Sequence, residues 1–345
     1  MSPAPITVVG AGAIGGFVGA RLLAAGEVVR FVEANEAHAA AMRKDGLRVT
    51  GAESLHVRAK VALPAELEGR LSVVLLAVKA RDTATAMETI APRLSPDGCI
   101  VSLQNGLEEY RIAAAVGAER TVGASLTFGG HYVGPGEIAY GGPASFHIGE
   151  LDGATTPRVE RLADLLSAAH PAEVTTRIFG HLWGKSALGA YYFATALVDA
   201  DVREILSRAE VLPALATLVA EVARVAAAEG VACEPVNGFD PGAFLRGDEA
   251  GMQASWAAQR RYWADLQATR TGVWRDLWVH RRPTELREIV VPILERAHTQ
   301  GIDVPLLERL TELVGAAEAG HLPEGWDALD KLAQDRLERI ELRAP

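Results

Sequence analysis

The stretch that decides the fold is Ile6-Thr7-Val8-Val9-Gly10-Ala11-Gly12-Ala13-Ile14-Gly15-Gly16. Its β-branched start has the composition of a buried parallel strand, and an apolar helical pattern follows the glycines. The glycines have the G-x-G-x-x-G spacing, and each has a physical role. Gly10 permits a tight turn, Gly12 lets a pyrophosphate approach the backbone, and Gly15 lets helix and strand pack closely. Strand, glycine turn and helix in this order predict a dinucleotide site.

The same unit predicts how the cofactor is held. The helix start at Ala13 and Ile14 offers free N–H groups to the phosphates. Glu33 ends the second predicted strand, 28–33, where a carboxylate accepts hydrogen bonds from ribose hydroxyls and favours NAD. An ordinary solvated strand end is the alternative for Glu33, and Arg30 nearby leaves NADP open.

Composition restricts the class of protein. The chain has 345 residues, 49% of them hydrophobic, and a formal net charge of -10. The length suits two domains, and the charge argues against a nucleic-acid partner. Cys99 and Cys233 suit a reducing compartment, and no apolar run approaches the ~18 residues of a spanning helix. We expect a soluble cytoplasmic protein with no membrane partner.

Two later strands of the first half end in polar residues. The strand 72–78 ends at Lys79, and the strand 98–103 continues into Gln104-Asn105-Gly106. Ligands bind at the carboxyl edge of open α/β sheets, so both residues are candidates for cofactor and substrate contacts. A solvated helix cap is the alternative for Lys79, and an ordinary turn residue is the alternative for Asn105.

The remaining patterns predict the domain organisation. Strand signals stop near residues 176–179, so we expect a Rossmann domain over 1–177 and an all-helical domain over 178–345. His131 and His147 lack ligand partners in the sequence, so we expect no metal site. Other expected elements are helices over 17–25, 37–44, 83–94 and 252–268, a hairpin over 47–62, strands over 121–126 and 145–149, glycine-rich turns extending that sheet over 129–142, and a loop over 235–247.

Two stretches of the helical half carry chemistry. Lys185, in His181-Leu182-Trp183-Gly184-Lys185-Ser186, lies in an otherwise apolar helix. A lysine there usually extends to solvent, but one pointing into a cleft loses solvation and can deliver a proton. The second stretch, 272–285, places Arg275, Arg281 and Glu285 around a helix start. Either guanidinium could bind a carboxylate in bidentate fashion.

The chain resembles the ketopantoate reductase family (2-dehydropantoate 2-reductases and relatives) nearly end to end. The matching motifs are Gly10-x-Gly12-x-x-Gly15, Ala77-Val78-Lys79, Leu103-Gln104-Asn105-Gly106, Trp183-Gly184-Lys185, Pro283-Thr284-Glu285 and Gly301-Ile302-Asp303-Val304-Pro305. The resemblance implies a Rossmann domain and an all-α domain of the 6-phosphogluconate dehydrogenase-like type, with the active site in the cleft between them. It also implies hydride transfer between nicotinamide and a 2-oxo acid. Lys185 is then the general acid, Asn105 and Lys79 contact nicotinamide and substrate, and Glu285 binds substrate.

The chain also departs from the family pattern. Members commonly carry an asparagine one turn after the lysine, where this chain has Gly189. A serine usual in the substrate site falls at Gly272 or Val273. These departures predict that the scaffold and acid are kept while the substrate contacts are altered.

The sequence therefore predicts an NAD(P)-dependent oxidoreductase of a 2-oxo acid/2-hydroxy acid pair, with a small carboxylic acid other than ketopantoate as substrate. The substrate-binding set is Lys79, Lys185, Arg275 and Glu285. The alternatives are a genuine 2-dehydropantoate 2-reductase and a non-catalytic dinucleotide sensor, which would need neither Lys185 nor Glu285. The apolar surface of the helical domain makes a homodimer the expected state.

Overall fold

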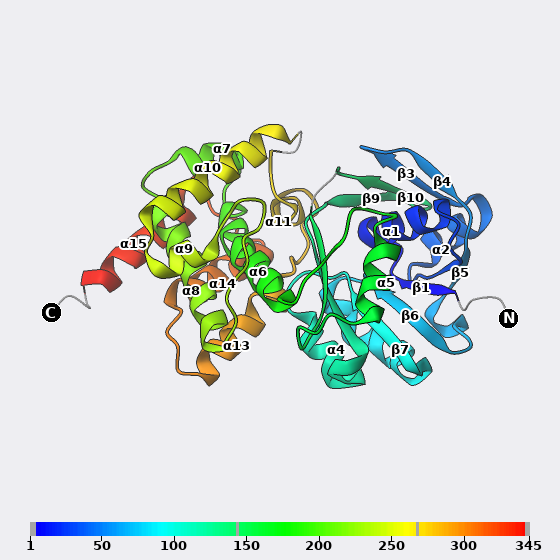
Figure 1. Ribbon diagram of the computed structural model, residues 1–345. Helices are drawn as coiled ribbons and strands as arrows, with labels where there is room; N and C mark the ends of the chain where they lie inside the picture. Colours follow the sequence, from blue (N-terminus) through cyan, green and yellow to red (C-terminus); the bar gives the residue numbers. More distant parts are fainter. Residues whose placement is uncertain (1–4, 143–144, 267–268, 342–345) are drawn as a thin grey trace. The chain divides into compact units, whose positions relative to one another are not determined.

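The computed structural model describes residues 5–142, 145–266 and 269–341, with side chains described as far as residue 336 (Figure 1). The chain forms two compact units, Met1–Ile178 and Phe179–Pro345. The first unit is mixed α/β and the second is helical.

The first unit is built on an eight-stranded sheet in the order β12-β11-β8-β7-β6-β1-β2-β5. All neighbouring pairs are parallel except β11 with β8. Its strands are β1 (Ile6–Val9), β2 (Val29–Val32), β5 (Lys60–Ala62), β6 (Leu71–Leu76), β7 (Leu94–Ser102), β8 (Thr121–Leu126), β11 (Phe146–Glu150) and β12 (Glu173–Val174). β1 lies between β2 and β6, and this is where the connections change direction across the sheet.

A second, four-stranded sheet corrects one expectation. The glycine-rich segment does form a hairpin, but it belongs to a separate sheet in the order β4-β3-β10-β9. Its strands are β3 (Leu47–Gly51), β4 (Leu55–Val57), β9 (Gly130–Gly134) and β10 (Glu137–Tyr140). β3 pairs with β10 in parallel, and no local sequence pattern predicts this long-range pairing. The predicted hairpin at 47–62 is therefore β3 and β4 alone, because β5 joins the main sheet beside β2.

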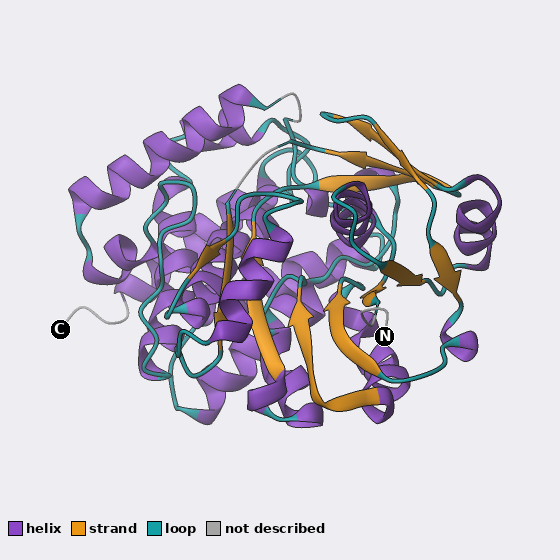
Figure 2. Ribbon diagram, turned by 45° about the vertical axis from the view of Figure 1, so that its right-hand side comes forward, coloured by secondary structure: helices purple, strands orange, loops and turns teal. Residues whose placement is uncertain are grey.

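Helix α1 (Ala13–Ala24) contacts strands of both sheets, as Figure 2 shows. This explains its composition, because a helix covered on both sides is apolar nearly all round. The other helices of this unit are α2 (Glu36–Asp45), α3 (Thr83–Ile90), α4 (Glu108–Val116), α5 (Pro157–Leu166) and the short 3-10 turns η1 (Pro64–Glu66), η2 (Ala80–Asp82), η3 (Ala91–Arg93) and η4 (Ala118–Arg120).

Some predicted boundaries in this unit were wrong. α1 begins at Ala13, four residues before the predicted start, because the helix continues directly from the glycine turn. The helix expected over 83–94 ends at Ile90, since Pro92 cannot continue it, and β7 begins at Leu94. The two-residue β12 was not predicted. Its residues are exposed and lack the apolar signal of the inner strands.

The second unit consists of helices α6 (Ile178–Thr195), α7 (Val202–Ser207), α8 (Leu212–Ala228), α9 (Pro241–Arg246), α10 (Glu249–Asp265), α11 (Gly272–Trp274), the π-helical η5 (Arg275–Val279), α12 (Leu286–Ile289), α13 (Val291–Thr299), α14 (Pro305–Glu318) and α15 (Asp327–Glu341). The predicted loop over 235–247 contains α9. There the Asp240 carboxylate accepts a hydrogen bond from the Gly242 N–H at 2.8 Å, and Pro241 fits the first helical position. The helix predicted over 252–268 is α10, and residues 267–268 lie outside the described part. No described helix is long and apolar enough to cross a membrane.

Candidate active site

The glycine turn lies where β1 meets β6, at the carboxyl edge of the main sheet. Gly10 has φ +92°, and a Cβ there would lie 2.9 Å from the Val78 backbone nitrogen. A Cβ at Gly15 would lie 2.1 Å from the Gly10 carbonyl oxygen. A Cβ at Gly12 would meet nothing within 4 Å, so this side of the turn is open. Packing requires Gly10 and Gly15, while Gly12 leaves room for a ligand at the strand crossover where open sheets bind nucleotides.

The start of α1 suits the phosphates of a dinucleotide. Gly12 is the N-cap and supplies no side-chain capping bond, and the first turn carries no acidic residue. Ala13 and Ile14 are partly exposed. The first N–H groups of this 12-residue helix are therefore available to bind an anion. The positive end of the helix dipole also favours a negative charge at this position.

Glu33 braces the glycine turn. One carboxylate oxygen accepts a hydrogen bond from the Ala11 N–H at 2.8 Å, and the other accepts one from the Asn35 N–H at 2.8 Å. Ionised carboxylates have about four acceptor positions, so both oxygens can still bind ribose hydroxyls. The arginines nearby bind elsewhere: Arg30 donates to Thr7 Oγ1 and the Glu68 carbonyl, and Arg43 to the Val61 carbonyl and the Glu66 carboxylate.

His38, which the sequence analysis did not single out, also holds this turn. The residue is 1% exposed, and its ring Nε2 lies 3.0 Å from the Ala11 carbonyl oxygen. Nδ1 accepts a hydrogen bond from the Gly136 N–H at 2.9 Å. Since Nδ1 is the acceptor, Nε2 donates and the ring is the neutral tautomer. His38 thus ties the glycine turn to the β9–β10 hairpin, and no spacing in the sequence marks it.

Lys79 and Asn105 follow neighbouring strands, β6 and β7, and both are exposed at the carboxyl edge. The buried Gln104 joins these strand ends, because its Nε2 donates to the Val78 carbonyl at 3.0 Å and to Thr83 Oγ1 at 2.8 Å. Gly106, with φ +84°, turns the chain after Asn105. The structure therefore brings Lys79 and Asn105 to the edge where Gly10 and Gly12 lie.

In the helical unit, α6 carries Lys185 on a narrow accessible stripe. From His181 to Thr195 the partly exposed residues are His181, Lys185, Gly189 and Tyr192, and all others are buried. Spacings of four, four and three residues place them along one face of the helix. Among the described residues, Lys185 therefore lies on the one face of residues 181–195 that is accessible to solvent.

The face of α6 that carries Gly180 and Gly184, next to this stripe, is packed tightly. A Cβ at Gly184 would lie 2.1 Å from the Glu234 carbonyl oxygen, and a Cβ at Gly180 would lie 2.7 Å from the Ala232 carbonyl oxygen. The Glu234 N–H also donates to the Gly180 carbonyl at 2.9 Å. The backbone of 232–234 thus lies directly on the helix, which explains the glycine between Trp183 and Lys185. A glycine inside a helix costs about 1 kcal/mol relative to alanine, and here close packing requires it.

The segment 272–285 holds the other predicted residues. Arg282 pairs with Asp276 at 2.7 Å, and the exposed Arg281 lies over the Trp278 ring. Arg275 is half-buried, and its guanidinium makes no hydrogen bond or ion pair with any residue the structure describes. Of these three arginines, Arg275 is thus the candidate for binding a carboxylate.

Glu285 stands at the N-cap of α12 and is partly buried. The preceding residue, Thr284, is fixed by Glu318, whose Oε1 accepts hydrogen bonds from the Thr284 N–H at 2.8 Å and from its hydroxyl at 2.5 Å. Trp278 Nε1 donates to the Ala196 carbonyl at 2.9 Å, which docks η5 beside the end of α6. The structure therefore gathers the Arg275 segment and α6 into one part of the helical unit.

Two family models match this chain, and together they account for most of it. "Ketopantoate reductase PanE/ApbA" matches residues 6–153, and its C-terminal counterpart matches residues 178–318. The chain belongs to the ketopantoate reductase family. The 2-dehydropantoate 2-reductase of Archaeoglobus fulgidus is 29% identical over 91% of this chain and 98% of that protein. The enzyme of the same name from Mesorhizobium japonicum is 31% identical over 58% and 72%.

Solved structures agree with this assignment. A 2-dehydropantoate 2-reductase from Geobacter metallireducens has a TM-score of 0.75 and 26% identity, covering 91% of this chain and all of that one. D-mandelate dehydrogenase, solved with NADH and anilino(oxo)acetate, has a TM-score of 0.78 and 22% identity over 92% and 99%, which shows a common fold. As a ketopantoate reductase family member, the protein is a dinucleotide-dependent oxidoreductase of CH–OH and C=O groups.

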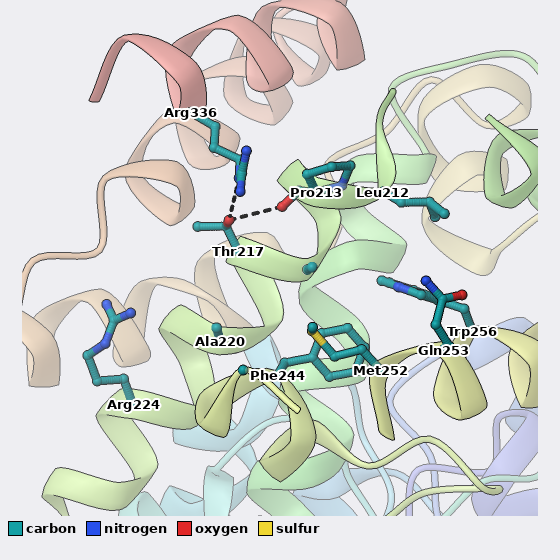
Figure 3. Close-up of a pocket in the computed structure, with 12 residues that line it drawn as sticks. Leu212, Pro213, Thr217, Ala220, Arg224, Phe244, Met252, Gln253, Trp256 and Arg336 are labelled. Carbon is teal, nitrogen blue, oxygen red and sulfur yellow. Dashed lines mark hydrogen bonds between the residues drawn. The ribbon is translucent and has the colours of Figure 1, made fainter. Parts of the chain in front are cut away.

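A pocket of the helical unit lies away from these residues. It has a volume of about 390 Å³ and lies among α8, α9, α10 and α15 (Figure 3). Among the lining residues, Thr217 donates a hydrogen bond to the Pro213 carbonyl at 2.9 Å and accepts one from Arg336 at 3.1 Å. None of the predicted site residues lines this pocket, so we do not assign the reaction to it.

Proposed function

We propose that this family member reduces a 2-oxo acid, or oxidises the matching 2-hydroxy acid, with Lys185 as the proton donor. The observation that carries the proposal is the position of Lys185 on the one accessible stripe of an otherwise buried helix. The nicotinamide supplies the hydride when the cofactor is bound. Reduction builds negative charge on the carbonyl oxygen, and an ammonium within hydrogen-bond reach stabilises that charge and then gives up a proton.

The other side chains are proposed to orient the reactants. Arg275 binds the substrate carboxylate, since its guanidinium has no partner among the described residues and matches a carboxylate with two parallel hydrogen bonds. Asn105 bonds the nicotinamide ribose and the substrate, and Lys79 contacts both. Glu285 accepts a hydrogen bond from a substrate hydroxyl.

We further propose NAD as the preferred cofactor. Glu33 offers acceptors to ribose hydroxyls and would repel a 2′-phosphate. Arg30 and Arg43, the cations that could otherwise bind this phosphate, already bind protein acceptors.

Ketopantoate is proposed not to be the best substrate. The argument rests on Gly189, Gly272 and Val273, which offer no side-chain hydrogen bond where one is expected. Each polar group left unpaired costs roughly 1 to 3 kcal/mol. The curated relatives named 2-dehydropantoate 2-reductase favour the second candidate, a genuine ketopantoate reductase.

The test replaces Lys185 and measures turnover on a panel of 2-oxo acids with NADH and NADPH. Lys185→Ala should lower kcat by two to four orders of magnitude, about the contribution of a positioned proton donor. Cofactor binding, followed by nicotinamide fluorescence, should be unchanged. Near wild-type turnover in the variant would remove Lys185 from the mechanism, and a kcat/KM for ketopantoate above all other acids would establish the second candidate.

A further inference from the structure

The pocket among α8, α9, α10 and α15 is open because α8 lines it with small side chains. Ala216, Thr217 and Ala220 line it at helical spacings of three and four residues, so they share one face of α8. An alanine side chain ends at Cβ, and this face therefore leaves room beside the neighbouring helices. The volume of about 390 Å³ falls within the range of small-ligand sites, about 300 to 1,000 Å³.

A second wall of the pocket, from α9 and α10, is apolar and firmly packed. Phe244 and Trp256 are 5% and 2% exposed, and their rings meet edge-on with centroids 5.1 Å apart. The Trp256 ring also packs against Tyr191 of α6, at 5.4 Å. Met252, one helical turn before Trp256, is partly exposed and adds an adaptable apolar side chain. This wall offers an alkyl or aryl group a surface that is already in place.

Arg224 and Arg336 carry the only ionisable side chains that line the pocket. Arg336 Nε donates to Thr217 Oγ1 at 3.1 Å, and an Arg224 amine donates to the Asp303 carbonyl at 3.3 Å. Both acceptors are neutral, and neither guanidinium forms an ion pair with a side chain that the structure describes. Each guanidinium has five N–H donors, so donors remain for a ligand. In a chain of net charge -10, two cations without a carboxylate beside them favour an anion.

We propose that this pocket is a second ligand site, which binds an amphipathic carboxylic acid. In Figure 3 the two arginines lie on one side of the pocket, and Met252 and Trp256 lie on the other. The carboxylate binds Arg336 and Arg224 through charge-assisted hydrogen bonds, and the apolar body packs on Trp256 and Met252. The site is independent of the proposed function, because no residue proposed for the reaction lines it.

The experiment titrates decanoate into the full-length protein by isothermal titration calorimetry. Decylamine, which has the same chain length and a positive charge at neutral pH, is the comparison probe. Decanoate should bind at one site with a Kd of about 0.1 mM, and decylamine should bind at least tenfold more weakly. Arg336→Gln should weaken decanoate binding about tenfold, because it removes the charge that pairs with the carboxylate. Saturating NADH should leave the Kd for decanoate unchanged.

Matched variants separate the pocket from the rest of the surface. Ala220→Leu fills the space with another good helix former, so it should abolish decanoate binding. Ala227→Leu makes the same change at an exposed position of α8, and Arg261→Gln removes an exposed arginine from α10. Neither control residue lines the pocket, so both variants should bind decanoate as the wild-type protein does.

Four results would overturn this assignment. They are no binding of decanoate, equal affinity for decanoate and decylamine, competition between decanoate and NADH, and wild-type affinity in Arg336→Gln. The last of these decides the matter even if Ala220→Leu fails to fold. Light scattering tests a different occupant: a dimer that Ala220→Leu converts to a monomer would show that a second copy of this chain covers the pocket, which would also overturn the assignment.

Discussion

Glu221 should make the stability of the helical unit depend on pH. Its side chain, on α8, is 2% exposed, and its two oxygens accept hydrogen bonds from the Leu306 and Leu307 N–H groups at 3.1 Å and 2.8 Å. These bonds cap the start of α14. Burial raises the pKa of this carboxyl from its usual 4.5 to about 7, against the opposing effect of the two N–H groups.

The sign and size follow from proton linkage. Between pH 4.5 and 7 the folded protein keeps the proton on Glu221 and the unfolded chain releases it. The contribution to stability is therefore complete below pH 4.5 and is lost as pH rises through about 7. At about 1.4 kcal/mol per pH unit, the difference between the two pKa values corresponds to about 3 kcal/mol.

Urea unfolding followed by tryptophan fluorescence measures this directly, because all six tryptophans lie in the helical unit. Glu221→Gln keeps the shape and removes the titration, so subtracting its stability from that of the wild-type protein at each pH cancels the other groups. The wild-type protein should lose about 3 kcal/mol relative to the variant between pH 4.5 and 8. Parallel pH profiles for the two proteins would refute the reasoning.

The remaining predictions concern the cofactor and the packing of α6. NADH should bind at least tenfold more tightly than NADPH in a fluorescence titration. Glu33→Gln should reduce this difference in affinity, because it removes the negative charge that repels a 2′-phosphate. Tighter NADPH binding by the wild-type protein would contradict this and point to Arg30 or Arg43 as the phosphate ligand. Gly184→Ala should destabilise the helical unit by about 1 to 3 kcal/mol or more in urea unfolding, since its Cβ would overlap the Glu234 carbonyl. A stability equal to that of the wild-type protein would mean that the 232–234 backbone can move away.

The dinucleotide turn was predictable from the sequence because its geometry is local. A buried strand, a tight turn and a helix start lie within eleven residues, and the spacing of the three glycines marks that unit. The close contact that requires Gly15 lies inside the unit, whereas the backbone that crowds Gly10 belongs to Ala77 and Val78. The position of Glu33 was predictable for the same reason, since it ends the next strand of the sheet. The change to an all-helical second half was also visible as a loss of strand patterns.

Only the tertiary structure decided which segments meet across long separations. His38 binds Gly136, 98 residues away, and β3 pairs with β10, so neither contact leaves a local pattern. Gly184 and Gly189 are the same residue type in the same helix, five positions apart. They differ because the 232–234 backbone covers one and nothing in the described unit covers the other. The sequence by itself determined the strand-turn-helix order through short-range sterics, whereas the need for a glycine at each position of α6 depends on what the rest of the chain places against it.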